Sequence, residues 1–416
     1  MVSRGTTQQS SAPYNRRIVL DIIRRQGTAS RKEIVDLVSL SPQTVANITN
    51  DLETIGLIRA KRASGPKSRG QPPIALELNP NAGHSIGISL EPGRVSAALV
   101  NLVGEIHSRC EVELDTHDQR RTLSAMLGLI DDLIRPASSG RLWGVGIALP
   151  GPLIETDISF VGPTALEGWK DLSIFDALRD ETRLQVFYSV DSVAGALGET
   201  LFGVAKLLDS FFYLHLGVGL GGTLVINRSA YRGANGNATE IGHIPVVPGG
   251  KACYCGNAGC LERYLSLHSL AEALGVADAA DRASIIAEKL ARNEDPVLLA
   301  WSAQAAERLR DAVCTIENML DPPTIVIGGS APKVLVERLV ARAQPLHHSV
   351  RGGVRSTLAR ILLSERQEDS SILGAAVLPI YDLLSPRLEV LQQDRRAEAD
   401  VADLLGQRPV SRAGRL

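Results

Sequence analysis

The stretch EIGHIPVVPGGKACYCGNAGCLERY, from Glu240 to Tyr264, holds three of the five cysteines of this 416-residue chain. A histidine precedes the first of these cysteines by ten residues, and glycines between them allow the backbone to turn tightly. Thiolates and imidazoles are ligands that zinc prefers, and a structural zinc site uses four ligands. The stretch therefore predicts a tetrahedral Cys3His zinc site with the ligands His243, Cys253, Cys255 and Cys260.

Free buried thiols are the alternative explanation for this cluster. Three cysteines within eight residues are hard to explain by packing alone, which favours the metal site. Because protein ligands fill all four positions, no place is left for a water molecule, so the metal is expected to fold the loop and to catalyse no hydrolysis. Cys110 and Cys314 are isolated in the sequence and are predicted to be structural.

The composition of the chain indicates a cytoplasmic protein. Five cysteines are too few for a disulfide framework, and their odd number would leave a free thiol in an oxidising compartment. The N-terminus MVSRGTTQQSSAPYNRR lacks the apolar core of a signal peptide. The run from Ser210 to Asn227 approaches membrane-spanning length, but four glycines divide it into strand, turn and strand, so no membrane segment is expected.

Charge is distributed unevenly along the chain. The formal net charge is −2, yet residues 1–73 hold twelve Lys or Arg and only five Asp or Glu. That segment therefore carries +7 and the remainder −9. Such an asymmetry is expected when a small nucleic-acid-binding module is fused to an acidic body.

Three helices are predicted in the basic segment. The first carries apolar residues at helical spacing and ends at Gly27. The second begins with a capping box formed by Ser30 and Glu33. The third has Ser41 as its N-cap and Pro42 at its first position, where the missing N–H removes no hydrogen bond.

The third helix is predicted to bury an apolar stripe and to leave uncharged polar side chains on its opposite face. Amide side chains can pair with adenine edges in the major groove, and two short helices joined by a tight turn are typical of a helix-turn-helix DNA-binding unit. An ordinary three-helix bundle with a polar outer face is the alternative. The residues of this helix and its cap that we expect on DNA are Ser41, Gln43, Thr44, Asn47 and Asn50.

A predicted hairpin favours DNA binding over the plain bundle. IRAKRASGPKSRGQPPIALEL, residues 58–78, is a basic strand, a Gly/Pro/Ser tip and an apolar strand. Lys67 and Arg69 at the tip can neutralise phosphates in or beside a minor groove, although a solvated flexible tip is compatible with the same pattern. We expect a flexible N-terminus over residues 1–14 and a winged helix-turn-helix over residues 15–78.

The body has a different pattern. After Pro80, strands and helices alternate with glycine turns, as in a doubly wound or actin-like α/β protein. Residues 385–416 lose this alternation and become charged and rich in arginine, so a tail that frays after Gly406 is expected.

The segment TEIGHIPVVPGGKACYCGNAGCLE resembles the signature of the ROK family, which groups bacterial sugar kinases with sugar-responsive transcriptional regulators. The likeness combines Glu-x-x-His with Cys-x-Cys-Gly-x-x-Gly-Cys-Leu-Glu, and the regulator branch carries a winged helix-turn-helix like residues 15–78. The resemblance implies a two-lobed, actin-like (sugar kinase, ASKHA) ATPase-type α/β fold. Residues 79–196 and 366–384 would form the first lobe, and residues 197–365 the second lobe with the zinc loop.

The resemblance also implies a sugar pocket beside the metal. Glu240, His243 and Glu262 occupy positions that contact sugar hydroxyls in the family, and Asp191 occupies the position of the kinases' catalytic base. Carboxylates accept hydrogen bonds from vicinal hydroxyls, and an imidazole bound to zinc through one nitrogen keeps the other for a ligand. Each carboxylate alone could instead be a surface residue or a helix cap. Val190 stands where the kinases have asparagine, which removes one polar contact.

The phosphate loop differs from that of the kinases. Where they have Asp-x-Gly-Gly-Thr, this chain has Ser89 at the aspartate and Glu91-Pro92 at the glycines. Proline has no N–H to donate to a phosphate, and the negative charge of a glutamate repels the phosphate. We therefore expect no ATP binding and no enzyme activity, and we interpret the body as a former enzyme domain that now acts as a sensor.

These features predict a transcriptional regulator that represses an operon for carbohydrate uptake or breakdown. A homodimer or tetramer would bind a palindromic operator, and a sugar or sugar derivative entering between the lobes would release it. Two alternatives remain: a sugar kinase with a DNA-binding appendage, which ATP turnover would reveal, and a regulator controlled by a protein partner, which would not respond to sugars when purified alone. Activation in place of repression also stays open, and the sequence names no particular sugar or operator.

Overall fold

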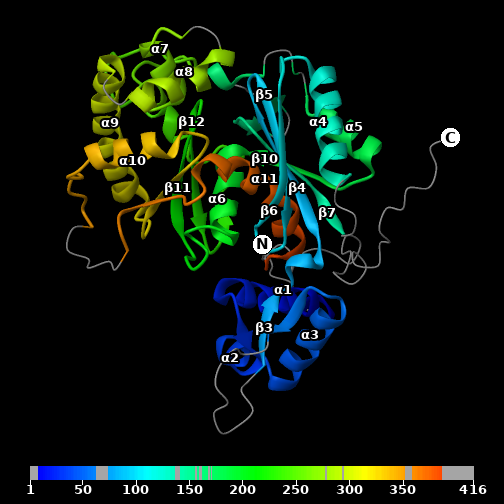
Figure 1. Cartoon of the computed structure of the whole chain (residues 1–416). Helices are drawn as coiled ribbons and strands as arrows, with labels where there is room; N and C mark the ends of the chain where they lie inside the picture. Colours follow the sequence, from blue (N-terminus) through cyan, green and yellow to red (C-terminus); the bar gives the residue numbers. More distant parts are fainter. Residues whose placement is uncertain are drawn as a thin grey trace, which may run out of the picture.

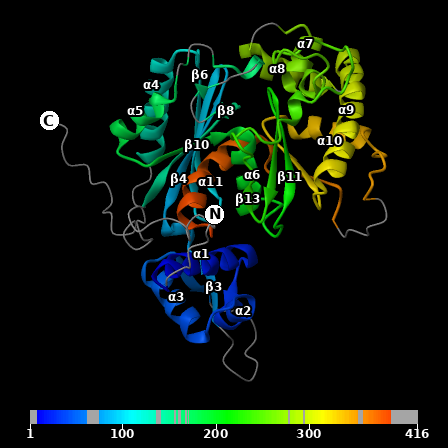
Figure 2. The ribbon, with the colours of Figure 1, turned by 180° about the vertical axis from the view of Figure 1, so that it is seen from behind.

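The computed structural model places a small N-terminal domain beneath two α/β lobes that lie side by side (Figure 1, Figure 2). The structure describes residues 8–61, 74–135, 141–154, 157–158, 162–166, 169, 171–276, 279–292, 295–351 and 358–386. The predicted DNA contacts Lys67 and Arg69 lie outside the described residues, as does the predicted tail beyond residue 386.

The N-terminal domain has three helices and a three-stranded antiparallel sheet. The helices are α1 (Gln8–Gln26), α2 (Arg31–Leu37) and α3 (Pro42–Thr54). The strands, in spatial order, are β1 (Ala29–Ser30), β3 (Ala75–Leu78) and β2 (Ile58–Lys61). The hairpin of β2 and β3 supplies the two predicted wing strands, so the domain has the element order of a winged helix-turn-helix.

Local capping determines where two of these helices begin. Ser30 accepts a hydrogen bond from the backbone N–H of Glu33, and the Glu33 carboxylate accepts one from the N–H of Ser30, as the sequence predicts. The Ser41 hydroxyl caps α3, and Pro42 occupies its first position. Helix α1, however, begins at Gln8, so part of the segment expected to be flexible is helical. Its first turn carries no apolar stripe, and periodicity alone therefore does not reveal it.

The first lobe is built on a five-stranded mixed sheet. Its strands, in spatial order, are β10 (Val186–Val190), β7 (Leu142–Leu149), β4 (His84–Glu91), β5 (Arg94–Asn101) and β6 (Ile106–Glu113). Helices α4 (Gln119–Ile134) and α5 (Ser173–Thr182) lie on one side of this sheet and α11 (Ser370–Leu384) on the other (Figure 1). Gly87 and Gly146 permit the close approach of α11, because a Cβ atom at these positions would lie 2.2 Å and 1.8 Å from backbone oxygens of that helix.

The second lobe has its own five-stranded sheet. Its strands, in spatial order, are β13 (Ser229–Ala230), β12 (Leu220–Ile226), β11 (Phe211–Leu216), β14 (Ile325–Gly328) and β15 (Ile361–Leu363). Its helices are α7 (Leu267–Ala273), α8 (Ala279–Arg292), α9 (Pro296–Leu320) and α10 (Lys333–Arg342). Apolar side chains of α9, among them Leu309, Val313 and Ile316, pack into one buried cluster with residues of β11 and β14.

The run from Ser210 to Asn227 forms the antiparallel pair of β11 and β12, as the glycine pattern predicts. Among the described residues, no helix is long and apolar enough to cross a membrane. The remaining short elements are β8 (Leu153–Ile154), β9 (Asp157–Ile158), η1 (Pro80–Ala82), η2 (Gly162–Thr164), η3 (Ile241–His243), η4 (Leu261–Arg263) and η5 (Gln367–Asp369).

Helix α6 (Asp191–Leu201) lies between the two lobes, where it packs against α11 and contacts strands of both sheets. The N-terminal domain is joined to the same region through α1, because apolar residues of α1, including Val19 and Ile23, share one buried cluster with Leu201 of α6 and Leu383 of α11. The domain that carries α3 is therefore packed on the body, with its α1 at the base of both lobes (Figure 2).

Candidate functional site

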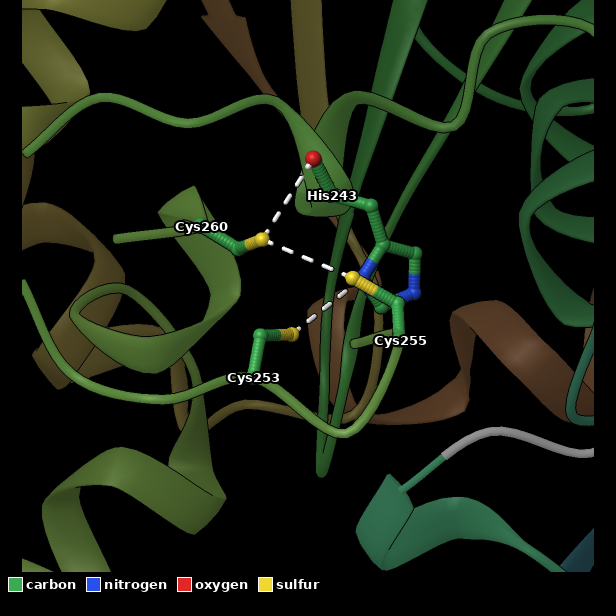
Figure 3. A group of neighbouring side chains, drawn as sticks. All are labelled: His243, Cys253, Cys255 and Cys260. Atoms are coloured by element: carbon green, nitrogen blue, oxygen red, sulfur yellow. Dashed lines mark hydrogen bonds between the residues drawn. The ribbon is translucent and has the colours of Figure 1, made fainter. Parts of the chain in front are cut away.

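The four predicted metal ligands lie together in the loop between β13 and α7 (Figure 3). Their ligand atoms all lie within 4.8 Å of one another. The distance from Cys253 Sγ to His243 Nδ1 is 3.6 Å, and that from Cys255 Sγ to Cys260 Sγ is also 3.6 Å. The prediction that these residues form one cluster is confirmed.

The spacing of the cluster fits a tetrahedral metal ion. Zinc–sulfur and zinc–nitrogen bond lengths place ligand atoms about 3.8 Å apart for two sulfurs and about 3.6 Å apart for a sulfur and a nitrogen. Burial, with a further contribution from the two neighbouring thiols, raises the pKa of the Cys260 thiol to about 12. A divalent cation would oppose this effect, because it stabilises thiolates directly.

The backbone of the loop holds the ligands in place. The N–H of Cys253 donates to the carbonyl oxygen of Asn257 at 2.7 Å, which closes a tight turn that contains Cys253 and Cys255. Gly259 has φ +81°, and a Cβ atom there would lie 1.8 Å from the carbonyl oxygen of Val247. No other residue fits this position, so the glycine before Cys260 is required for the loop to close.

A pocket lies beside this cluster, with lining residues from both lobes. It brings together the four predicted effector-binding residues Asp191, Glu240, His243 and Glu262. Asp191 is the first residue of α6, Glu240 and His243 belong to the turn that contains η3, and Glu262 belongs to η4. The Nδ1 atom of His243 faces the cysteines while its ring also lines the pocket, so this side chain connects cluster and pocket.

Asp191 is held by two neighbours. Its Oδ1 accepts a hydrogen bond from the N–H of Ser192 at 2.6 Å, and its Oδ2 lies 3.5 Å from Nε2 of His215. Burial raises the pKa of the Asp191 carboxyl, and the nearby His215 partly offsets this effect. The direction of this carboxyl in the pocket lining is therefore fixed.

The two glutamates differ in exposure. Glu262 is buried, its Oε2 accepts a hydrogen bond from the N–H of Leu220 at 2.9 Å, and burial raises its pKa to about 7. Gly219 makes room for this carboxyl, because a Cβ atom there would lie 2.9 Å from Glu262 Oε2. Glu240 is exposed as a residue, yet desolvation of its carboxyl, together with the charges of Asp191 and Glu262, raises its pKa.

Sequence analysis did not identify three other polar residues of the pocket, Thr164, Ser192 and His215. The sequence does mark His215, because it is a polar residue between Leu214 and Leu216 in a strand that is otherwise apolar. In the structure this histidine is only 4% exposed. A buried histidine in such a strand needs a polar partner, here Asp191. Thr164 lies in η2, and no motif or periodicity marks it.

The segment that replaces the kinases' phosphate loop forms the hairpin turn between β4 and β5. Ser89 is buried near the end of β4, and Glu91 pairs with Arg94 at 2.9 Å across the turn. The N–H of Gly93 donates to Thr116 Oγ1 at 3.0 Å. Because Pro92 has no N–H, the N–H of Gly93 is the next backbone donor in this turn, and the Thr116 hydroxyl already accepts from it.

The predicted DNA-contacting face of α3 is exposed, and it opposes the buried stripe Val45, Ile48 and Leu52. Gln43 Nε2 donates to Asn47 Oδ1 at 2.9 Å, and Arg31 of α2 donates to Asn50 Oδ1 at 2.8 Å. These hydrogen bonds align the amides on one surface. The two other residues predicted to contact DNA, Ser41 and Thr44, also form the N-cap of α3, because the Ser41 hydroxyl accepts a hydrogen bond from the N–H of Thr44 at 3.1 Å.

The fold and the site define a class of protein: a two-lobed, sugar-kinase-like α/β body with a carboxylate pocket between its lobes and a small helical domain at its N-terminus. Within that class the chain belongs to the ROK family, whose sequence model matches residues 85–381. This result confirms the resemblance found in the glycine- and cysteine-rich loop.

Comparisons with individual proteins extend the match beyond the body. The xylose repressor of Caldicellulosiruptor bescii is 27% identical over 392 residues, which cover 89% of this chain and 96% of the relative. The glucokinase of Halalkalibacterium halodurans is 30% identical over 269 residues, which cover 60% of this chain and 80% of the enzyme. A crystal structure of a ROK family transcriptional regulator, a homolog of the E. coli MLC protein, superposes with a TM-score of 0.68 at 25% identity and covers 92% of this chain and 100% of its own.

Proposed function

We propose that this protein is a DNA-binding transcriptional repressor of an operon for carbohydrate uptake or breakdown, and that a sugar or sugar derivative releases it from its operator. One observation carries the proposal. Helix α1 packs the domain that exposes the amides of α3 onto the body that contains the carboxylate-lined pocket, because its buried residues share one apolar cluster with α6 and α11. The likeness over nearly the whole chain to a protein named as a xylose repressor supports the same function.

The DNA-binding part of the proposal rests on α3. Gln43, Asn47 and Asn50 are exposed on one face, and α3 would lie in the major groove with these amides toward base edges. The +7 charge of residues 1–73 would provide the sequence-independent attraction to phosphates. A homodimer, or a tetramer built from dimers, would place two such helices on the half-sites of a palindromic operator. Lys67 and Arg69 keep their proposed role as phosphate or minor-groove contacts.

The effector part rests on the pocket. Carboxylates of Asp191, Glu240 and Glu262 would accept hydrogen bonds from ring hydroxyls, and the His243 nitrogen that faces away from the cysteines would provide a further contact. The lining residues come from both lobes, so a ligand that contacts all of them favours one arrangement of the lobes over another.

His243, Cys253, Cys255 and Cys260 would hold a structural zinc ion, whose chemistry is to bind thiolates and an imidazole in a tetrahedron. With four protein ligands the ion would not take part in a reaction. By fixing the ring of His243, the loop would keep that side chain oriented toward the pocket.

Contacts of α1 suggest how the pocket controls the DNA-binding domain. Arg17 donates to the carbonyl oxygens of Asp382 and Ser385, at the end of α11 in the first lobe, at 3.2 Å and 3.3 Å. Arg25 forms an ion pair with Asp209 of the second lobe at 3.2 Å. Because α1 is attached to both lobes, a change in their relative position would move the domain and alter the separation of two α3 helices in a dimer.

Sugar kinase activity is the second candidate function. The retained Asp191 and the glucokinase relative favour it. The turn at Pro92 opposes it, because Pro92 has no N–H, the N–H of Gly93 is bonded to Thr116, and Glu91 would repel phosphate. We therefore propose that the body neither binds ATP productively nor phosphorylates a sugar.

Two assays on the purified, zinc-loaded protein test the proposal. Thermal unfolding with a panel of sugars, polyols, sugar phosphates and ATP with magnesium identifies ligands of the folded state, which raise the midpoint. A titration of an operator fragment then measures release by the ligand found. A midpoint shift with one sugar and loss of operator binding support the repressor. A shift with ATP and sugar-dependent ATP turnover would support the kinase instead, and no response to any sugar would point to control by a protein partner.

A further inference from the structure

Residues 162–166 of the first lobe contact the second lobe at two points. A Cβ atom at Gly162 would lie 2.9 Å from Cδ2 of Tyr254, so the tyrosine ring lies directly against the backbone of the glycine. A Cβ atom at Gly219 would lie 3.2 Å from the methyl carbon of Thr164. Thr164 and Gly219 both line the carboxylate pocket. The contact between Tyr254 and Gly162 therefore joins the two lobes close to the pocket.

The first-lobe side of this contact is anchored in the core of its lobe. Leu166 and Trp169 are 1% and 7% exposed, and both belong to the buried apolar cluster of the first lobe. The indole N–H of Trp169 donates to the carbonyl oxygen of Thr116 at 2.9 Å. Gly162 itself has φ +78°, a conformation that favours glycine. The backbone that meets Tyr254 is therefore fixed to the first lobe.

Tyr254 is anchored in the second lobe, in the cysteine loop, where it lies between two of the proposed metal ligands. The guanidinium of Arg263 lies over its ring, 4.9 Å from the centroid, and its hydroxyl lies 3.0 Å from Nε2 of His268 on α7. Glu272 of the same helix holds both neighbours. It accepts from Arg263 Nη2 at 2.8 Å and 3.0 Å, and it lies 3.1 Å from His268 Nε2. The direction of the tyrosine ring is thus set by the second lobe alone.

Tyr254 is nevertheless 52% exposed. An aromatic ring that is held on one side and open to water on the other gains free energy when further apolar surface covers it. Residues 162–166 already touch the ring at Gly162, so a small approach of the lobes would cover more of it.

We infer that Tyr254 is a positioning residue for closure of the two lobes: its ring packs on the backbone at Gly162 and stabilises the closed arrangement. Because the same loop carries the cysteines, the contact links the metal loop to the first lobe. Occupation of the pocket by an effector would bring the lobes together and bury the ring. The effect on effector binding rests on the proposed function, whereas the packing of the ring on Gly162 does not.

The packing is tested without any ligand, on the full-length, zinc-loaded protein. Hydrogen exchange followed by mass spectrometry should show several-fold faster exchange in peptides that contain residues 162–166 when Tyr254→Ala is compared with the wild type. Tyr254→Phe, which keeps the ring, should exchange like the wild type. So should Tyr231→Ala, because Tyr231 lies in the same lobe directly after β13 and is 53% exposed. Equal zinc content would show that the cysteine loop is intact, and unchanged exchange in a zinc-loaded Tyr254→Ala would overturn the inference.

A second measurement uses the wild-type side chain and so covers the case in which Tyr254→Ala loses its metal or does not fold. Fluorine NMR on protein labelled with meta-fluorotyrosine reports on all seven tyrosines, and Tyr254→Phe and Tyr231→Phe identify two of the signals. D-xylose, D-glucose and N-acetyl-D-glucosamine are the probes. A sugar that binds should shield the Tyr254 signal from a soluble gadolinium chelate and leave the Tyr231 signal as accessible as before.

The affinity for that sugar gives the last comparison. Calorimetry should show roughly 10-fold weaker binding to Tyr254→Ala and wild-type binding to Tyr254→Phe. A bound sugar that leaves Tyr254 as accessible as before, or that binds Tyr254→Ala as tightly as the wild type, would overturn the inference and leave the sugar-controlled repressor intact. If none of the sugars binds, the proposed function fails and the effector role of Tyr254 fails with it, while hydrogen exchange still decides whether the ring positions the lobes.

Discussion

Arg228, in the turn between β12 and β13, contacts Asp21 of helix α1, with 3.4 Å between Nη2 and Oδ1. The same guanidinium donates to the carbonyl oxygens of Thr200, Lys206 and Leu208 at 2.9 to 3.1 Å. Both charged side chains are largely buried, and burial lowers the pKa of Arg228 while Asp21 opposes that shift. This ion pair connects the second lobe with the domain that carries α3.

Replacing Arg228 should therefore weaken both folding and signal transfer. We expect Arg228→Ala to lower the free energy of unfolding by about 2 kcal/mol, because Asp21 and three carbonyl oxygens lose a partner. In the proposed repressor it should also reduce sugar-induced release from the operator, while sugar binding persists. Chemical denaturation and operator titrations measure the two effects. Arg232→Ala, at an exposed position, is the matched control, and equal behaviour of the two variants would contradict the prediction.

Metal removal should unfold the cysteine loop. We expect about one zinc ion per chain, and chelation should lower the unfolding midpoint, because the metal-free cluster leaves thiols packed against one another. Colorimetric zinc analysis and thermal unfolding provide the measurements. Cys255→Ser should lose the metal, whereas Cys110→Ser and Cys314→Ser, outside the cluster, should retain it. Full metal content in Cys255→Ser would argue against the proposed ligand set.

Glu262→Gln should separate effector binding from DNA binding. The amide keeps the shape of the side chain but loses the charge that accepts hydrogen bonds most strongly, so sugar affinity should fall roughly 10- to 100-fold. Operator affinity should stay the same, because α7, which directly follows η4, lies at the opposite end of the molecule from α3 (Figure 1). Calorimetry and operator titration give the two affinities. Glu307→Gln, at an exposed position of α9, should leave both unchanged, and normal sugar binding by Glu262→Gln would remove Glu262 from the pocket's function.

Asn47→Ala should weaken operator binding by about 1–3 kcal/mol, because a bidentate contact from an amide to adenine is worth this much. Its dependence on salt should match the wild type, since no phosphate contact is lost. Thr54→Ala serves as the control on the same helix, because Thr54 is exposed at the far end of α3. Fluorescence anisotropy with an operator and a random duplex distinguishes loss of specificity from loss of folding. Equal losses on both duplexes would speak against base recognition.

Glu199 should make stability depend on pH. Burial raises its pKa above the ordinary value of 4.5, although Ser364 and the N–H of Val204 oppose that shift. The folded state therefore keeps a proton that the unfolded chain releases, and stability should fall as pH rises from about 4.5 through the raised pKa. Glu199→Gln should reduce this slope and gain relative stability at neutral pH. Unfolding midpoints measured from pH 5 to 8 would show this smaller pH dependence of the variant. Parallel curves of midpoint against pH for variant and wild type would contradict the prediction.

Several features follow from short stretches of sequence because their causes are local. The capping box of Ser30 and Glu33 and the Ser41 cap depend on residues three positions apart, so the starts of α2 and α3 were predictable. Helical spacing likewise predicts the buried stripe of α3. The start of α1 at Gln8 was not predictable in this way, because its first turn has no such stripe.

The sequence by itself predicted the cluster of one histidine and three cysteines, since these four residues lie within eighteen positions and the glycines between them permit a tight loop. The family resemblance had implied that Asp191 joins the glutamates of that loop, but only the tertiary structure decided that His215 of β11 lies beside Asp191 and that Arg228 reaches Asp21. The physical reason is separation along the chain. Local hydrogen bonds and side-chain periodicity act over a few residues, whereas these contacts exist only after both sheets have packed around α6.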